Sequence, residues 1–250
     1  MKIADYIKKE IVNVKKMPRK ERWEYFWEYY KWHAIITLVV IAILVQGVVG
    51  RLTRKDIVFS GFVVNSIINV QDEAFLQGFY DCAGIDAETQ EAAIYTDLVI
   101  TDRNSQTDIT AFQRIVAGIA SEDTDFVVGT PEAYHICAYS TARIFKDLRD
   151  FLDADALARH EDKLYYIDGA VIEILRADPS SVIDFTQLEY PDPTKPETME
   201  DPIPVGIDIS NCADFQAAYY FPNTTFYLGV TATAPHADLT QQFIRYLFAE

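Results

Sequence analysis

IVFSGFVV, residues 57–64, is the first of three short apolar stretches that decide the fold of this chain. EAAIYTDLVI at 91–100 and DFVVG at 125–129 follow it, and all three are rich in the β-branched and aromatic residues that favour strands. Short, unbroken apolar stretches are typical of strands that are covered on both faces of a sheet. The three stretches are therefore predicted to be strands of one buried sheet.

Helical patterns separate these strands. DEAFLQGFYDC, residues 72–82, predicts a helix with Asp72 as its N-cap and Gly84 at its end. A second helix is expected to be capped by Thr107 or Asp108, because apolar residues then recur at steps of three and four: Ile109, Phe112, Val116 and Ile119. Parallel strands need a crossover long enough for a helix, so this alternation predicts an α/β fold with parallel pairing.

The second half of the chain is less regular. Pro131 is expected to open the helix PEAYHICAYS, which ARIFKDLRDFLD follows. Residues 178–204 hold six of the 10 prolines and predict an irregular excursion, either a lid or hinge-proximal loop or a loop without a function. Regular secondary structure is expected to resume at PVGIDIS (204–210) and TFYLGVT (225–231). A closing helix from about Ala237 carries one apolar face: Leu239, Phe243, Leu247 and Phe248.

Residues 34–50, AIITLVVIAILVQGVVG, carry no charge. At about 1.5 Å per residue these positions extend roughly 25 Å, slightly less than the ~30 Å hydrocarbon core of a bilayer. The aromatic residues just before them favour the headgroup level, and they include all three tryptophans: Trp23, Tyr25, Phe26, Trp27, Tyr29, Tyr30 and Trp32. The stretch is predicted to be a transmembrane helix; a cleaved signal peptide and a buried core helix are the alternatives.

The distribution of charge predicts the orientation. Residues 1–33 contain nine Lys and Arg against five acidic residues, a net charge of +4. Basic residues favour the cytoplasmic side. We therefore expect a cytoplasmic head at 1–33, a membrane helix at 34–50, a linker at 51–56 and an extracellular domain at 57–250, in a single-pass protein of the cell membrane.

Composition narrows the possible partners. Residues 34–250 contain 13 basic against 33 acidic residues, a net charge of −20, which disfavours nucleic acid as a partner. The 3 cysteines, Cys82, Cys137 and Cys212, have no metal-ligand spacing, and the sequence assigns no disulfide between them.

The stretch from Asp125 to Asp153 resembles bacterial extracellular solute-binding proteins of the type 2 periplasmic-binding fold. In that family a D-x-φ-φ strand precedes a helix and an A-x-x-G-x-φ-x-D-L-x-x-φ-L element. Here the element is Ala138 to Leu152, with matches at Phe145, Asp147, Leu148, Phe151 and Leu152. FYLGVTATAPHADLTQQFIRYLF near the C-terminus is similar to the strand, turn and helix that close the family's domain. The layout also resembles single-pass membrane-tethered proteins of Gram-positive bacteria.

The resemblance covers residues 56–152 and 203–250, and its motifs are structural. Ala142 and Arg143 stand where the family has a glycine, and the domain is shorter than typical receptors after residue 153. The resemblance implies an α/β fold class: an N-terminal amphipathic or transmembrane helix, then a periplasmic-binding-protein-like domain with a reduced second lobe.

In such a fold, ligands lie at the carboxyl ends of strands and between lobes. Polar residues at those places form a set of candidate ligand contacts: Asn65, Ser66, Asp97, Thr101, Thr130, Glu132, Ser210, Asn211 and Tyr219. A turn or helix-capping role is the alternative for each of the polar ones. Tyr95, Tyr134, Tyr219 and Tyr220 offer rings that could stack on a sugar, with core packing as the alternative.

Metal and catalytic signatures are not found in the sequence. Asp102, Asn104, Gln106 and Asp108 alternate like calcium ligands, but the sixth position lacks Gly and the twelfth lacks Glu. The four histidines are isolated, and no HExxH, GxSxG, P-loop or GxGxxG pattern occurs. We therefore predict no cofactor, no metal and no catalytic residues.

The leading hypothesis is a non-enzymatic, membrane-tethered module that binds a small polar solute, a sugar or peptide. Such a module would pass the solute to a transporter or report it to another membrane protein. The alternative is a structural or interaction domain that keeps the fold without a solute site and binds another protein. An enzyme would need carboxylates brought together in a cleft, which sequence spacing does not show.

Overall fold

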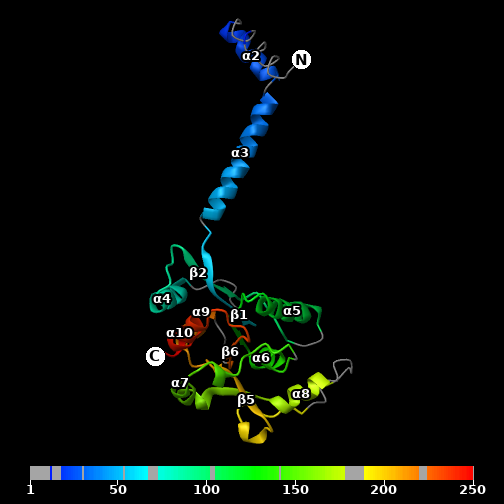
Figure 1. Cartoon of the computed structure of the whole chain (residues 1–250), viewed down its shortest axis with the longest axis vertical. Helices are drawn as coiled ribbons and strands as arrows, with labels where there is room; N and C mark the ends of the chain where they lie inside the picture. The colour runs from blue at the N-terminus through cyan, green and yellow to red at the C-terminus, as the bar shows by residue number, and fades with distance from the viewer. Residues whose placement is uncertain are drawn as a thin grey trace. The chain divides into compact units, whose positions relative to one another are not determined.

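The computed structural model describes residues 12, 18–29, 31–52, 54–66, 73–101, 105–140, 142–177, 189–219 and 224–249. The chain divides into two compact units, Met1–Arg54 and Lys55–Glu250. The described residues of the first unit include the helices α2 (Arg19–Tyr29) and α3 (Lys31–Leu52) (Figure 1). The predicted helix at 34–50 is thus the central part of a longer one. Of the predicted linker at 51–56, residues 51 and 52 belong to α3 and Asp56 belongs to the first strand.

None of the helices in the described part of the chain has the length and apolar character needed to cross a membrane. The expected membrane span at residues 34–50 gains no support from this finding and stays a prediction.

The second unit is built on one mixed sheet of six strands in the order β2-β1-β3-β6-β5-β4. The strands are β1 (Asp56–Val64), β2 (Gln90–Tyr95), β3 (Phe126–Gly129), β4 (Leu164–Asp168), β5 (Pro202–Asp208) and β6 (Tyr227–Val230). β1 pairs in parallel with both β2 and β3, which confirms the parallel pairing expected of the first three strands. β6 lies antiparallel between β3 and β5, and β4 is antiparallel to β5, so the sheet as a whole is mixed.

Helices cover both faces of this sheet (Figure 1). Phe59 and Val63 of β1 face one core cluster, whereas Phe62 and Val64 face another, as the two-residue period of a strand requires. The first face is covered by α4 (Glu73–Ala83), α9 (Ala213–Tyr219) and α10 (Ala237–Phe248). The second face is covered by α5 (Gln106–Ala120), α6 (Pro131–Ala138) and α8 (Gly169–Ala177). The result is a three-layer α/β/α arrangement.

Short elements complete the unit between the main helices and strands: η1 (Leu148–Asp150), α7 (Ala154–Arg159), η2 (Glu161–Lys163) and η3 (Pro196–Thr198). η1 lies inside the stretch ARIFKDLRDFLD. Outside η1, Phe145 in this stretch makes an isolated bridge to Thr231. The stretch therefore joins the sheet by one residue and is otherwise turns.

Two predicted element boundaries were wrong. The second strand ends at Tyr95 instead of residue 100, because Leu98 and Ile100 leave the sheet to bond Asn65. The second helix begins at Gln106, because the hydroxyl of Ser105 accepts the backbone N–H of Asp108 at 3.0 Å. The predicted apolar face of that helix was also partly wrong: Ala111 and Ile115 are buried, whereas Ile109 is exposed.

The sequence analysis did not identify β4 and α8. β5 begins at Pro202, so the predicted Pro-rich excursion ends at residue 201, three residues earlier than expected, and residues 178–188 of it lie outside the described part. Asp72, the predicted cap of α4, also lies outside it. Gly84 follows α4 with φ +68°, which confirms its role as the left-handed residue that ends the helix.

All three cysteines are free; Cys82 is exposed, and Cys137 and Cys212 are buried.

Candidate binding site

The carboxyl ends of the parallel strands meet at one edge of the sheet, as the sequence analysis expected. Gly129 at the end of β3 lies opposite Val64 of β1 on one side and Tyr227 of β6 on the other. Tyr227 in turn lies opposite Asp208, the last residue of β5. The predicted contact residues that follow β1, β3 and β5 therefore approach the same edge from three strands.

Asn65 and Thr130 are brought together at this edge, but they bond to the protein itself. The Asn65 amide donates to the Ile100 carbonyl at 2.8 Å and to the Thr130 hydroxyl at 2.9 Å, and its oxygen accepts from the Ile100 N–H at 2.8 Å. Asn65 holds φ at 64°, a left-handed conformation that Asn tolerates. The geometry gives Asn65 a turn-stabilising role and explains why the chain after β2 leaves the sheet.

The other predicted polar residues mostly serve local structure. The Ser66 hydroxyl donates to the Tyr219 carbonyl at 3.2 Å. Asp97 forms an exposed ion pair with Arg114, and Thr101 bonds to Asp108. The Ser210 hydroxyl accepts the Phe226 N–H at 2.8 Å, and Asn211 is exposed in the following turn. Tyr219 is fully buried, which agrees with the core-packing alternative for its ring.

Glu132, one of the predicted contact residues, lines an open pocket at this edge. The pocket is shallow and widely open to solvent, with a volume of ≈ 420 Å³. It is bordered by the first turns of α6 and by residues of β4, β6 and the loop before β5: Pro131, Glu132, His135, Ile136, Tyr165, Pro193 and Tyr227. The site lies on one sheet edge of a single sheet-centred unit, and not between two lobes as the family resemblance implied.

Packed tyrosines form the floor of this pocket. The Tyr165 ring lies edge-on to Tyr227, with centroids 4.7 Å apart, and to Tyr134 at 4.9 Å. Tyr134 is buried beneath them and donates its hydroxyl to the Val205 carbonyl at 2.7 Å. A Cβ at Gly206 or Gly229 would lie within 2.4 Å of that hydroxyl, so these two glycines make room for it. The floor is therefore rigidly supported from the strands below.

The polar groups of the pocket have different environments. His135 Nδ1 lies 3.2 Å from the Tyr165 hydroxyl, and the imidazole packs edge-on against Tyr190. Burial raises the pKa of Tyr165, and burial together with the nearby carboxylates of Asp208 and Asp192 raises the pKa of Tyr227. A tyrosine phenol is already protonated at neutral pH, and the raised pKa values extend this state to more alkaline pH, so both hydroxyls can donate hydrogen bonds. The Glu132 side chain makes no ion pair with any described residue.

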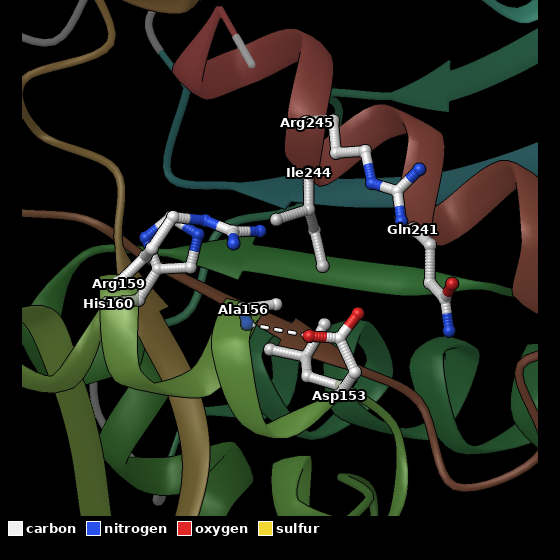
Figure 2. A pocket seen from close by; sticks show the side chains of 8 residues that line it. Asp153, Ala156, Arg159, His160, Gln241, Ile244 and Arg245 are labelled. Carbon is white, nitrogen blue, oxygen red and sulfur yellow. Dashed lines mark hydrogen bonds between the residues drawn. The ribbon is translucent and has the colours of Figure 1, made fainter.

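A second pocket is too small for a solute. It lies between α7 and α10, where Arg159 and His160 approach Arg245 and Gln241 (Figure 2). Its volume is ≈ 20 Å³, which is room for about one water molecule. Asp153 at its border accepts the Ala156 N–H at 2.7 Å and so caps α7.

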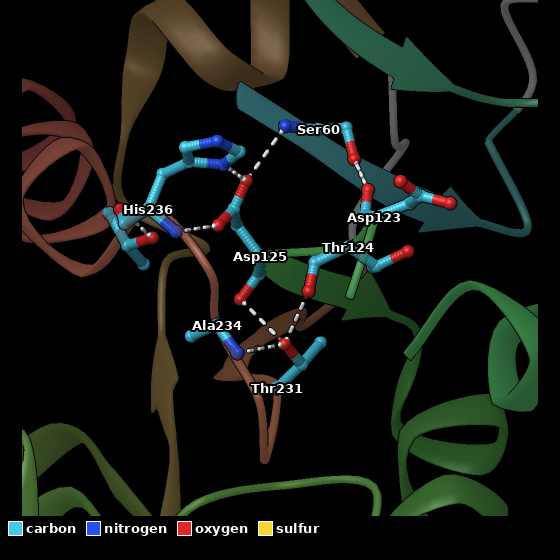
Figure 3. A network of polar contacts seen from close by, with 8 residues as sticks. Ser60, Asp123, Thr124, Asp125, Thr231, Ala234 and His236 are labelled. Atoms are coloured by element: carbon cyan, nitrogen blue, oxygen red, sulfur yellow. Dashed lines mark hydrogen bonds and ion pairs between the residues drawn. The ribbon is translucent and has the colours of Figure 1, made fainter. Parts of the chain in front are cut away.

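A buried polar network lies at the opposite, N-terminal end of β3 (Figure 3). Asp125 is fully buried, and its carboxylate accepts the backbone N–H of Ser60 at 2.9 Å and of His236 at 2.8 Å. His236 Nδ1 lies 3.1 Å from the same carboxylate. The hydroxyl of Ser60 donates to the Asp123 carbonyl and so points away from the imidazole, an arrangement that does not supply a nucleophile to His236.

Metal binding has no support in the described residues, because they contain no cluster of three potential ligands. Of the four alternating residues that resembled a calcium loop, Asp102 and Asn104 lie outside the described part. Gln106 begins α5, and Asp108 is buried against Thr101. Asp108 thus has a structural role.

The sequence analysis missed most of the pocket. It singled out Glu132, and it named Tyr134 as a ring that could stack on a sugar, but Tyr134 is buried below the floor. His135, Tyr165, Pro193 and Tyr227 were not predicted. The only local signal was the first turn of α6, where Glu132 and His135 lie three positions apart and therefore on one side of the helix.

Comparison of this chain with protein-family models, with curated proteins and with solved structures finds no match.

Proposed function

We propose that the Lys55–Glu250 unit is a non-enzymatic binding module for a small polar solute. The observation that carries the proposal is the pocket of Glu132, His135, Tyr165 and Tyr227. Small-molecule sites combine a concave, mostly apolar surface with a few polar groups that orient the ligand. This pocket offers two prolines and an isoleucine beside a carboxylate, an imidazole and phenol groups.

The fold proposed for this unit is a one-sheet relative of the type 2 periplasmic-binding fold. Support comes from two places where the structure follows the expected order of elements. β3 is followed directly by α6, and β6 is followed by the closing helix α10. In that family the bound solute is passed to a transporter or sensed, and we propose one of these outcomes here.

Solute binding is tested by thermal unfolding of the full chain with a library of sugars, amino acids, short peptides and amines. A solute at 100 times its Kd adds about 2.7 kcal/mol of stability. For a domain of this size that raises Tm by several degrees. Amide hydrogen exchange should then slow in α6 (Pro131–Ala138) and stay unchanged in α4 (Glu73–Ala83) on the opposite face. A library in which no solute raises Tm would remove this function.

We also propose that the N-terminal unit anchors the chain in the cell membrane, with 1–33 on the cytoplasmic side and 57–250 outside. Because no described helix qualifies as a membrane span, the support is the surface of α3 and the distribution of charge. Large apolar side chains are exposed at nine of the eleven positions from 35 to 45, so they go round the whole helix: Ile35, Ile36, Leu38, Val39, Val40, Ile41, Ile43, Leu44 and Val45. The tether would hold the binding module near a membrane partner.

Membrane anchoring is tested by fractionation. The wild-type chain is expected to stay in the membrane pellet after an alkaline carbonate wash, and L38R/I41R is expected to enter the soluble fraction. I109R/I174R is the matched control, because Ile109 and Ile174 are also exposed apolar residues but lie on the second unit. Protease added to intact cells should remove the second unit only. Release of the wild type by the wash would contradict the anchor, and protection of the second unit would contradict the orientation.

A further inference from the structure

The charges around the pocket are mainly negative. Glu132 is the only Asp, Glu, Lys or Arg among its lining residues. Asp208 and Asp192 add two more carboxylates beside the Tyr227 ring, as their effect on its pKa shows. Lys195 neutralises Asp192 through an ion pair of 2.8 Å, whereas Asp208 accepts only the backbone N–H of Ser210 among the described residues. The pocket therefore has a negative electrostatic potential.

The rest of the unit strengthens this potential. Residues 55–250 contain 11 Lys and Arg against 33 Asp and Glu, a net charge of −22. A concave site within a surface of one sign concentrates ligands of the opposite sign. Anionic solutes are thus disfavoured both at long range and at the pocket.

Tyr227 supplies an independent indication of a ligand. Its side chain is 9 % exposed and lines the pocket, yet its hydroxyl has no hydrogen-bond partner among the described residues. The neighbouring phenols do have partners: Tyr134 bonds to Val205, and Tyr165 to His135. The hydroxyl is not one of the buried atoms that lack a partner, so it reaches solvent at the pocket surface and is available to a bound polar solute.

We infer that this pocket selects a small organic cation whose ammonium nitrogen carries apolar substituents and which also carries a hydroxyl or similar polar group. The Glu132 carboxylate would pair with the charge, the tyrosine rings would contact the substituents, and the Tyr227 hydroxyl would bond the polar group. The face of an aromatic ring attracts organic cations electrostatically. A metal ion is a poor fit, because Glu132 and His135 are the only His, Cys, Asp or Glu in the lining, and the described residues hold no group of three such ligands. The inference rests on the proposed binding function, since it concerns the same pocket.

The probes are choline and its neutral isostere 3,3-dimethylbutan-1-ol, titrated calorimetrically into the full chain. They share shape and hydroxyl group and differ in charge. Choline is expected to bind at least tenfold more tightly than the isostere. E132Q is expected to weaken choline binding about tenfold, and Y227F by a smaller factor. E88Q is the matched control, because Glu88 is an exposed glutamate on the loop before β2, away from the pocket, and should leave choline binding unchanged.

Each outcome decides one question. Choline binding that needs Glu132 supports the inference. Three outcomes would overturn the cation selectivity while leaving a solute-binding function intact. These are equal affinities for the two isosteres, binding of sugars but not choline, and an E132Q variant that binds choline normally. If neither isostere, no sugar, no peptide and no other amine binds, both the inference and the proposed function fail. Glu132 is exposed, so the Tm of E132Q is expected to equal that of the wild type and to exclude misfolding.

Discussion

Asp125→Ala is expected to lower the free energy of unfolding by about 3 to 5 kcal/mol, because it removes the acceptor of a buried network. The Asp125 carboxylate is fully buried and accepts backbone N–H groups from two separate segments, Ser60 in β1 and His236 before α10 (Figure 3). Alanine leaves both N–H groups without their acceptor and also removes the contact to the His236 ring. A buried donor that loses its acceptor costs more than the hydrogen bond itself contributed.

Asp123→Ala is the matched control for this prediction. Asp123 lies two residues earlier with an exposed side chain, and it joins the network only through its backbone carbonyl, which the substitution keeps. We expect D123A to change stability by no more than about 0.5 kcal/mol. Urea unfolding of the full chain should be followed by near-ultraviolet circular dichroism, because all 3 tryptophans precede residue 33 and do not report this unit. Equal stability of the two variants would show that the network contributes nothing measurable.

The buried network around Asp125 could not be predicted from the sequence. The strand at 125–129 was predicted from its apolar residues, which are local in sequence. Asp125 itself bonds to Ser60, which is 65 residues earlier, and to His236, which is 111 residues later. No local sequence pattern marks a residue whose partners are so distant. Its buried role follows from the sheet order, in which β1 and β6 flank β3.

The same reason explains how much of the candidate site could be predicted. Parallel pairing of β1, β2 and β3 followed from the helices between them, and it correctly indicated the sheet edge. Glu132 was found because it directly follows β3. Tyr165 and Pro193 come from β4 and the loop before β5, and they reach the pocket only because β4 forms the far edge of the sheet. The order of the last three strands was not predictable, since antiparallel insertion of β6 depends on packing and not on local pattern.

Phe243 occupies the centre of the aromatic core on the first face of the sheet. Its side chain is 0 % exposed, and its ring centroid lies 4.9 Å from Phe126, 5.1 Å from Phe79 and 5.2 Å from Phe59. These three rings belong to β3, α4 and β1 respectively. One side chain of α10 therefore joins two strands and a helix.

Phe243→Ala is expected to lower the free energy of unfolding by about 3 to 5 kcal/mol, because the removed ring leaves a cavity that its neighbours fill only in part. Phe243→Leu keeps a large apolar group and should cost clearly less. Phe248→Ala is the matched control: this ring lies on the same helix but is only partly buried, beside His160 and under the Lys163 ammonium group. Its loss should cost about 1 kcal/mol. If F248A destabilised the chain as much as F243A in urea unfolding, the closing helix would not be held chiefly by the aromatic core.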